Sequence, residues 1–574
     1  MKEENNTTEK LNFIEQIIEE HNETGKFDNR VHTRFPPEPN GYLHIGHAKA
    51  ICINFGIGKK YGGTTNLRFD DTNPLTEKTD FVEAIKRDIQ WLGFDWGDNL
   101  YYTSDYFQQL YDYAVQLIKK GEAFVDFSSP EVMDKEKKEG KDSAYRNTDV
   151  ATNLAEFEKM KSGGYPEGVC VLRLKIDMNH SNRLMRDPVI YRVIHQEHHR
   201  TGADWCIYPM YDWAHGQSDS LENITHSLCS LEFENHRPLY DWCQEELGIY
   251  RSQQIEFSRL NLDYTVTSKR KLKQLIEDEI VQDWDDPRMP TLSGMRRRGY
   301  TPSSIRNFIE RAGVSKRDQF IALSSLEASV RDDLNQVAPR VMGVLNPLKV
   351  VITNYPEGKT EQMTIENNPE DEAAGSRKVP FSREIYIEQE DFGTEGINKK
   401  WKRLAPDRNV RLKGAYIIHC HDHKRDEQGN ITEVHCTYYE DSKSGEDTSG
   451  VKPKGTLHWV SIADAVPAQV NLYDRLFSDP KPTGHKQAAT DEQGNPLTDS
   501  KGKEIQESVD FKEFLNPNSL QTITAYVEPS LATAVAGEAF QFMRLGYFCI
   551  DTTSTSDKLV FNRTVTLKDS WNRR

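Results

Sequence analysis

Two histidines near the start of the chain have the spacing of a phosphate-binding pair. His44 and His47 stand three residues apart in RFPPEPNGYLHIGHAKA, the segment from Arg34 to Ala50. Its prolines hold the approach extended, Gly41 permits a tight turn, and a helix is expected from about His44. Residues three apart share one face of a helix, and a helix N-terminus attracts anions through its free N–H groups. The pair is therefore suited to hold triphosphate oxygens during attack on an α-phosphate, whereas an isolated HxxH is usually two capping histidines.

A second cationic segment lies far along the chain. Lys269 stands in VTSKRK, residues 266–271, just before the helical text LKQLIED. Lysines on such a loop can neutralise β- and γ-phosphates only when the loop closes, which favours the transition state over the ground state. Alone, this segment would be a surface turn, and the histidine segment upstream is what supports the phosphate interpretation.

The elements around the first motif must hold it at the edge of a sheet. Strands are expected at 31–34 and 65–69, and helical periodicity covers 81–92 and 106–119. This alternation predicts a parallel nucleotide-binding sheet. Further expected features are a polar, lysine-rich excursion at 128–147, a strand at 169–177, and a sheet pattern that resumes near 205–211.

The second half of the chain has a different pattern. Residues 270–335 are expected to be helical, and after Pro347 short alternating runs separated by turn signals predict an all-β region. The segment 481–507 has little apolar content and is expected to be a surface loop or a partly disordered insert. Residues 1–30 are expected to be a polar lead with one amphipathic helix at 11–20.

Composition limits the class of protein. The 574 residues, 36% hydrophobic and 28% charged, suggest a water-soluble chain, of about three to five domains at roughly 100–200 residues each. No membrane span and no secretory signal are expected. The 8 cysteines form no CxxC pair, which favours reduced thiols in the cytoplasm over a disulfide frame or a zinc site. The histidines of HCHDHK (419–424) and VIHQEHHR (193–200) are expected on exposed polar faces; in the first, His419, His421 and His423 would share one face of a strand.

The net charge of −17 argues against a nucleic-acid partner when it is taken alone. Binding responds to local fields, however, and three basic clusters occur at 269–271, 296–298 and 399–403. Each cluster could equally be a solvated face.

The two motifs together resemble the HIGH and KMSKS signatures of class I aminoacyl-tRNA synthetases, the second with departures at Val266, Thr267 and Arg270. From about Asp28 to Trp571 the chain resembles the glutaminyl-tRNA synthetase family. The matching text is LRFDDTNP, MRDPVIYR, WCIYPMYD, ITHSLCSLEF, EFSRLNL, DDPRMPTLSGMRRRGY, LYDRLFS and FNRTV.

The resemblance implies an α/β Rossmann-type catalytic domain with an acceptor-binding insertion, a helical connector, and C-terminal all-β anticodon-binding barrels. The expected boundaries are 31–105 and 205–265 for the two halves of the Rossmann domain, 106–204 for the insertion, 266–345 for the KMSKS-like loop and connector, and 346–574 for the barrels. The insertion is a few residues shorter than usual, and Asn235 stands where an acidic acceptor-stem contact is common.

The implied activity is ATP-dependent ligation of L-glutamine to tRNA(Gln) through a glutaminyl-adenylate, by a cytoplasmic monomer that holds Mg²⁺ through ATP and needs no zinc. His44, His47 and Lys269 would be catalytic. The family's ATP contacts match Glu38, Pro39, Asn40, His44, Ile45, Gly46, His47, Ala48, Lys49, Ala50, Ser230, Arg259, Leu260, Thr267, Ser268 and Lys269. Its anticodon contacts match Arg340, Lys402, Arg403, Lys413, Gln541, Arg544 and Ser570.

The glutamine contacts match Asp70, Tyr211, Gln254 and Cys229; an exposed strand residue is the competing interpretation of Gln254. The eukaryote-like glutamyl enzyme is the alternative, but it has an arginine where this chain has Cys229, and a γ-carboxylate needs such a cation. A non-catalytic tRNA-binding relative would be expected to lose His44, His47 or Lys269. A small-molecule adenylyltransferase would not need the β-rich half.

Overall fold

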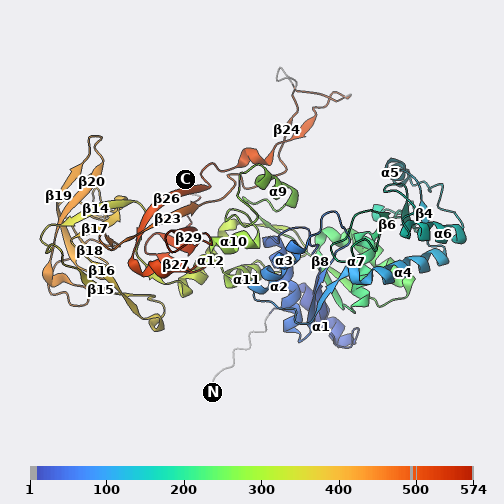
Figure 1. Ribbon diagram of the computed structural model, residues 1–574, viewed down its shortest axis with the longest axis horizontal. Coiled ribbons are helices and arrows are strands. Elements are labelled where there is room, and N and C mark those ends of the chain that lie inside the picture. The colour runs from blue at the N-terminus through green and yellow to red at the C-terminus, as the bar shows by residue number, and fades with distance from the viewer. Residues whose placement is uncertain (1–9, 491–495, 500, 570, 572–574) are drawn as a thin grey trace. The chain divides into compact units, whose positions relative to one another are not determined.

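The computed structural model describes residues 10–490, 496–499, 501–569 and 571. The chain divides into two compact units, which are described separately (Figure 1). Unit 1 comprises Met1–Asn261 and Ile309–Ile321, and unit 2 comprises Leu262–Phe308 and Ala322–Arg574. Within the described ranges, no helix is long and apolar enough to cross a membrane.

Unit 1 alternates helices and strands. Its helices are α1 Phe13–Thr24, α2 Ile45–Lys60, α3 Thr79–Trp91, α4 Phe107–Lys120, α5 Pro130–Glu139, α6 Val150–Lys161, α7 Tyr211–Leu221 and α8 Arg237–Leu247. Its strands are β1 His32–Phe35, β2 Thr64–Phe69, β3 Leu100–Tyr102, β4 Ala123–Asp126, β5 Val171–Leu174, β6 Val189–Val193, β7 Ile207–Pro209, β8 His226–Ser230, β9 Gln253–Phe257 and β11 Gln319–Ile321. Two further elements, β10 Leu260–Leu262 and α11 Pro302–Ala312, cross the division between the units.

Parallel strands form the centre of unit 1. β1 pairs with β2, β2 with β3, and β8 with β9, all in parallel. The Thr225 N–H donates to the His32 carbonyl at 2.9 Å, which sets β8 beside β1. The strand order is therefore β3-β2-β1-β8-β9, and the expected Rossmann-type sheet is confirmed.

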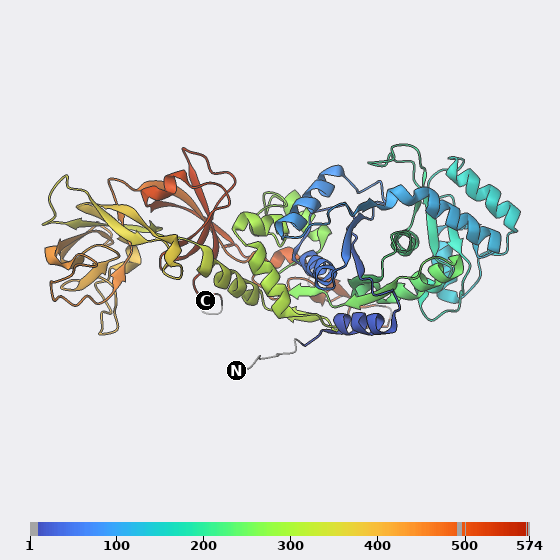
Figure 2. The ribbon, with the colours of Figure 1, turned by 90° about the horizontal axis from the view of Figure 1, so that it is seen from below.

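Neighbouring residues of β1 show which helices cover the two faces of this sheet. Side chains alternate along a strand. The Thr33 hydroxyl donates to the Asn54 carbonyl of α2 at 3.0 Å, whereas the Arg34 guanidinium points the other way, to Asp219 of α7. Helices α2 and α7 therefore lie on opposite faces (Figure 2).

A separate antiparallel sheet, ordered β4-β5-β6-β7, interrupts the parallel pattern. Its core includes Leu172, Ile190, Tyr191 and Ile207. Because β7 pairs with β6, the expectation that the parallel sheet resumes near 205–211 is wrong; it resumes at β8. The lysine-rich excursion forms α5, whose N-terminus is capped by the Ser129 hydroxyl.

Unit 2 begins with helices, as expected for 270–335. They are α9 Lys269–Glu277, α10 Leu292–Arg298 and α12 Leu323–Val337. The basic cluster at 296–298 is partly structural, because Arg297 forms an ion pair with Asp551 at 2.9 Å and Arg298 donates to the Thr564 carbonyl at 3.2 Å.

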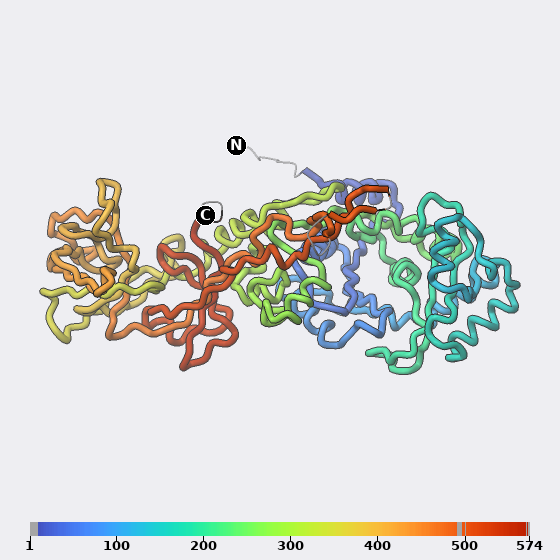
Figure 3. The backbone as a smooth tube through the Cα atoms, turned by 90° about the horizontal axis from the view of Figure 1, so that it is seen from above, coloured from blue at the N-terminus to red at the C-terminus, as the bar shows by residue number. Residues whose placement is uncertain are grey.

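Two seven-stranded, barrel-like sheets follow among the described residues of unit 2. The first is ordered β21-β18-β19-β20-β14-β17-β22 and the second β12-β27-β28-β29-β23-β26-β13. The chain enters the second sheet at β12 and β13, builds the first sheet, and returns to the second at β23. The red segment completes the second sheet (Figure 3). This confirms the predicted all-β barrel region.

The strands of the first sheet are β14 Pro347–Ile352, β17 Glu384–Glu388, β18 Asn409–Leu412, β19 Ile417–Arg425, β20 Ile431–Tyr438, β21 Thr456–Leu457 and β22 Val460–Ser461. Those of the second are β12 Arg340–Val341, β13 Gly343–Val344, β23 Val466–Tyr473, β26 Leu520–Val527, β27 Ala539–Phe542, β28 Gly546–Ile550 and β29 Leu559–Thr566. Two hairpins stand beside them, β15 Glu361–Glu366 with β16 Ser376–Phe381, and β24 Lys486–Ala488 with β25 Gln506–Ser508. The strands of the second hairpin lie near the two ends of the polar segment 481–507, which was expected to be a surface loop or a partly disordered insert.

A bulge in β19 overturns one expectation for the HCHDHK histidines. The pairing with β20 shifts between Cys420 and Asp422, so His423 lies opposite buried Val434. Its ring lies against Phe392, with centroids 5.5 Å apart. His423 is therefore turned toward the core side, away from the face that it was expected to share.

Gly299 provides a test of the packing between α10 and the second sheet. It ends α10 at φ 97°, and an added Cβ would lie 2.5 Å from both the Cys549 Cβ and the Thr564 Oγ1. We expect Gly299→Ala to lower the free energy of unfolding by about 1–3 kcal/mol, through overpacking in addition to backbone strain. Gly248→Ala is the matched control, since it ends α8 at φ 66° with open space around it. Equal losses in denaturant unfolding would contradict the packing argument.

Candidate active site and nucleic-acid interface

The candidate catalytic residues of unit 1 follow the carboxyl ends of its parallel strands. The proline segment follows β1, Asp70 follows β2, Ser230 ends β8, and Arg259 comes two residues after β9. The strand order reverses direction between β1 and β8, and ligands of open α/β sheets bind at such a switch point. The Asp70 N–H donates to the Pro37 carbonyl at 3.1 Å, which ties the first two of these segments together.

His44 and His47 cap the N-terminus of α2. His44 is the N-cap residue, and its Nδ1 accepts the Gly46 N–H at 3.1 Å. The His47 Nδ1 accepts the His44 N–H at 3.1 Å, and the two rings lie 3.9 Å apart. An Nδ1 that accepts carries no proton, so each neutral ring bears its proton on Nε2.

Electrostatics keep both rings in this neutral form. Burial lowers the pKa of His47 to about 4. Burial, and secondarily the neighbouring His47, lower the pKa of His44 well below its usual value. Near pH 7 the pair therefore offers two neutral Nε2–H donors at a helix N-terminus, where anions are favoured.

Other residues of unit 1 that were expected to contact the nucleotide bond to neighbouring side chains. Asn40 donates to the Glu38 carboxylate at 2.6 Å. The Lys49 ammonium donates to the Ser258 hydroxyl at 3.1 Å, and burial lowers its pKa to about 8. Ser230 donates to Glu232 at 2.8 Å, and Arg259 forms an ion pair with the same carboxylate at 3.1 Å.

Pro39, Ile45, Ala48 and Leu260 are buried, and Ala50 is half-buried, so these residues shape the site through packing and backbone. Gly46 has a specific reason for its small size, because a Cβ there would lie 2.8 Å from the His44 ring.

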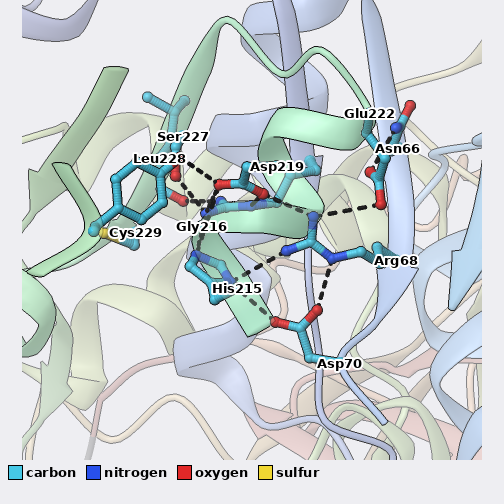
Figure 4. Close-up of polar contacts among 12 residues, drawn as sticks. Asn66, Arg68, Asp70, His215, Gly216, Asp219, Glu222, Ser227, Leu228 and Cys229 are labelled. Carbon is cyan, nitrogen blue, oxygen red and sulfur yellow. Dashed lines mark hydrogen bonds and ion pairs between the residues drawn. The ribbon is translucent and has the colours of Figure 1, made fainter. Parts of the chain in front are cut away.

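A buried network of charges supports Asp70 (Figure 4). The guanidinium groups of Arg34 and Arg68 are completely buried, and both bond to Asp219, at 3.1 and 2.7 Å. Arg68 also bonds to Asp70 at 2.7 Å. The Arg34 Nη2 donates to the His215 Nε2 at 2.7 Å, so the neutral His215 ring donates through Nδ1 to Asp70 at 3.0 Å.

The network sets the charge of Asp70. Burial alone would raise the pKa of this carboxyl, but Arg68 and His215 outweigh it and lower the pKa to about 2. Tyr211, the first residue of α7, stacks on His215 with ring centroids 4.9 Å apart. Burial raises the pKa of Tyr211 well above its usual value, so its hydroxyl remains a donor.

Gln254 and Cys229 lie on the neighbouring strands β9 and β8. Gln254 is buried, which excludes the exposed-strand interpretation, and it donates to the Phe233 carbonyl at 3.2 Å and to Glu256 at 3.0 Å. The Phe233 ring packs against the Tyr211 ring, with centroids 5.3 Å apart. Cys229 lies opposite Glu256 in the parallel register, and burial raises the pKa of its thiol, which stays neutral. The structure thus joins the four expected glutamine contacts through His215, Phe233 and Glu256.

The KMSKS-like residues belong to unit 2. Val266 is buried, Thr267 is half-buried, and Ser268 is exposed as the N-cap of α9. Lys269 is exposed and is the first residue of α9, whereas it was expected on the loop before that helix.

A pocket of about 470 Å³ lies where the two seven-stranded sheets meet. Its lining includes four of the expected anticodon contacts, Arg340, Lys413, Gln541 and Arg544. Arg340 and Gln541 are paired residues of β12 and β27. Arg403 shares a partner with Arg544: its Nε lies 3.4 Å from the carboxylate of Asp391, which also pairs with Arg544. Lys402 is exposed and does not line this pocket, and Ser570 lies outside the described residues.

Comparison with known proteins agrees with this arrangement along the chain. The family model "tRNA synthetases class I (E and Q), catalytic domain" matches residues 30–336. Two models of the anti-codon binding domain of the same family match residues 338–439 and 456–551.

Two curated relatives narrow the assignment. A glutamine–tRNA ligase from Rhodopirellula baltica is 54% identical, covering 99% of this chain and 91% of the relative. One from Proteus mirabilis is 53% identical, covering 98% of this chain and 97% of the relative. This chain belongs to the class I glutamine–tRNA ligase family. A solved glutamate tRNA ligase from Elizabethkingia meningosepticum is far more distant, at 19% identity and a TM-score of 0.41 over 54% of this chain and 70% of that one.

Several residues that shape the site of this glutamine–tRNA ligase relative escaped the sequence analysis. They are Arg34, Arg68, His215 and Asp219. Two signals were available: an Arg-Phe pair ends both β1 and β2, and His215 and Asp219 stand four apart on one face of α7.

A cluster of Asp71, His198 and His199 has its ligand atoms within 4.8 Å of one another. His198 is buried, so its expected place on an exposed polar face is wrong. Its Nε2 donates to the Asp71 carbonyl at 2.9 Å and its Nδ1 accepts the Arg200 N–H at 3.2 Å. Because both nitrogens are used by the protein, this cluster is a hydrogen-bonded support for the Asp70–Asp71 turn.

The depressed pKa values of the capping histidines predict a pH dependence of stability. An unfolded histidine takes up a proton near pH 6.5, whereas His47 in the folded protein does so near pH 4. Stability is therefore fully present above about pH 6.5 and is lost as the pH falls toward 4. We expect the unfolding midpoint of the wild type to fall more steeply over this window than that of His47→Asn. Parallel curves in thermal unfolding at graded pH would contradict the neutral assignment.

Proposed function

We propose that this chain joins L-glutamine to tRNA(Gln) with ATP, through a glutaminyl-adenylate, and releases AMP and pyrophosphate. The observation that carries the proposal is a preformed pair of neutral imidazole donors at the N-terminus of α2, together with a buried anionic Asp70, in a member of the glutamine–tRNA ligase family. The first group suits triphosphate oxygens and the second suits an α-ammonium group.

Activation would proceed by in-line attack of the glutamine carboxylate on the α-phosphate. The Nε2–H groups of His44 and His47 would donate to phosphate oxygens as negative charge builds there. Lys269 would neutralise the β- and γ-phosphates. Mg²⁺ would enter on the phosphates of ATP and supply charge neutralisation there.

The second step would transfer the glutaminyl group to the 2′-hydroxyl of the terminal adenosine of the tRNA. Positioning and phosphate stabilisation are the effects that the residues of this chain would supply in that step. The antiparallel sheet β4–β7 with α5 would hold the acceptor end of the tRNA, and the two barrels would read the anticodon. Residues 266–345 would connect the catalytic domain to the barrels. We further propose a cytoplasmic, monomeric enzyme.

Choice of glutamine over glutamate would follow because, among the residues that the structure describes, the arginines near Cys229 are already paired with carboxylates. Arg34 and Arg68 are committed to Asp219 and Asp70, and Arg237 lies 3.5 Å from Glu256. A glutamate γ-carboxylate would then be desolvated without a partner, which costs several kcal/mol, about a factor of a hundred or more in kcat/KM.

Loss of the phosphate contacts should affect chemistry more than substrate affinity. We expect His47→Asn or Lys269→Ala to slow ATP–pyrophosphate exchange by about 2–4 kcal/mol of lost transition-state stabilisation, with little change in glutamine KM. The exchange is measured with tRNA present, as the family resemblance requires. Lys273→Ala is the control, because Lys273 is exposed on the same helix in an ion pair with Glu277 at 3.0 Å. Unchanged exchange in both site variants would refute the assignment.

The amino-acid preference should depend on the neutral side chain at position 229. We expect wild type to charge a tRNA(Gln) transcript with glutamine and to use glutamate poorly. Cys229→Arg should lower kcat/KM for glutamine and raise it for glutamate, by about tenfold or more in their ratio. Cys229→Ala, which stays neutral, should keep the preference. If wild type charges glutamate comparably well, the proposed substrate is wrong.

A further inference from the structure

The pocket between the two barrels is lined by an arginine, Arg544, that is fixed by an ion pair with a buried carboxylate. Arg544 lies in the turn between β27 and β28 of the second sheet and lines the pocket. Its Nη1 and Nη2 donate to the Asp391 Oδ2 and Oδ1, each at 2.6 Å. Asp391 ends a short helical turn, Gln389–Asp391, that follows β17 of the first sheet. The ion pair therefore joins the two barrels at the edge of the pocket.

The two partners differ sharply in exposure. The Asp391 side chain is 1% exposed, whereas that of Arg544 is 34% exposed. Asp391 thus cannot face a bound nucleic acid, while Arg544 can. Arg544 also has φ 69°, a left-handed conformation that is unfavourable for a residue with a Cβ, and it persists here beside the bidentate pair.

Asp391 holds a second arginine as well. The Arg403 Nε lies 3.4 Å from the Asp391 Oδ1, and Arg403 also donates to the Glu390 carbonyl at 2.9 Å. One buried carboxylate therefore sets the positions of two cations that match the family's anticodon contacts.

The geometry leaves part of the Arg544 guanidinium available. A guanidinium has five N–H donors in a rigid plane, and a two-point contact with a carboxylate fixes that plane. Asp391 takes one donor from each terminal nitrogen of Arg544, and His458 lies 3.3 Å from its Nη1. The Nε–H and the second Nη2–H remain for a base, and their direction is set by Asp391.

We propose that Asp391 is a positioning residue for anticodon discrimination, which acts by fixing the guanidinium groups of Arg544 and Arg403 for hydrogen bonding to the edges of unstacked bases. The inference rests on the proposed function and extends it to a residue that touches no substrate. A free arginine would still attract phosphate, but only an oriented one distinguishes one base from another.

A matched control is present in the same unit. Glu528 is fully buried and pairs with Arg377 of β16, and it also accepts the Met342 N–H at 2.8 Å. This second carboxylate also ties the second sheet to the first barrel, but neither Glu528 nor Arg377 lines the pocket. Glu528→Gln therefore loosens a comparable link without touching a base-reading group.

The experiment measures kcat/KM for a glutamine transcript and for one with its central anticodon U replaced, using the full-length chain. Asp391→Asn should narrow the ratio between the two transcripts by about tenfold or more, since one well-oriented contact discriminates bases by about that factor. Asp391→Glu keeps the charge but displaces it, and should narrow the ratio by less. Glu528→Gln should leave the ratio as in wild type, whatever it does to the unfolding temperature.

The outcomes separate this inference from the proposed function. If wild type fails to charge tRNA with glutamine, the proposed function is wrong. If wild type charges both transcripts equally well, the proposed anticodon reading by the two barrels is wrong. If wild type discriminates and Asp391→Asn discriminates equally well, Asp391 is a structural residue only and the inference is overturned. Equal narrowing by Glu528→Gln would also overturn it. Should Asp391→Asn fail to fold, Asp391→Glu decides alone, and an unchanged ratio in that variant counts against the inference.

Discussion

The catalytic half of this protein depends on a pair of completely buried arginines. Arg34 and Arg68 are the penultimate residues of two adjacent parallel strands, β1 and β2, and Asp219 of α7 accepts from both. A buried charge is costly unless it is paired and hydrogen-bonded, and loss of one partner typically costs about 3–5 kcal/mol. Strands β1 and β2 can therefore pack against α7 only when these charges are assembled together.

The same network determines the chemistry at the surface of the sheet. Arg34 fixes the tautomer of His215 by donating to its Nε2, and His215 in turn donates to Asp70. Asp70 is thereby kept anionic with its carboxylate held in place, and Tyr211 is stacked on the ring of His215. A site that is rigid before the substrate arrives spends less binding energy on ordering its own groups.

Much of this fold could be predicted from local sequence patterns. The alternation around 31–119 predicted β1, β2 and the helices beside them, although β3 was missed. His44 begins α2 as an N-cap, close to where the proline and glycine signals placed it. The position of β7 could not be predicted, because periodicity identifies a strand but not its partner. The bulge in β19 was missed for a related reason: one extra residue reverses the faces of all that follow, and nothing in HCHDHK marks it.

The site residues were predictable only where they stand in a contiguous motif. His44, His47 and Asp70 could be proposed in this way. Asp219 and Asp391 could not, since their partners, Arg34 and Arg544, lie more than a hundred residues away in sequence. A carboxylate in isolation carries no signal, and it acquires a role only when the fold buries it beside a cation.

The overall charge of −17 is compatible with nucleic-acid recognition for the same reason. In unit 1, a buried arginine, Arg68, fixes the carboxylate of Asp70, the group that we propose binds the α-ammonium of the substrate. In the barrels the arrangement is reversed: the buried carboxylate of Asp391 pairs with Arg544, which lines the pocket. An arginine that is paired with a carboxylate has a fixed orientation, and the pair adds no net charge to the chain. The base recognition that we propose would depend on the geometry of single groups, so an acidic net charge does not argue against it.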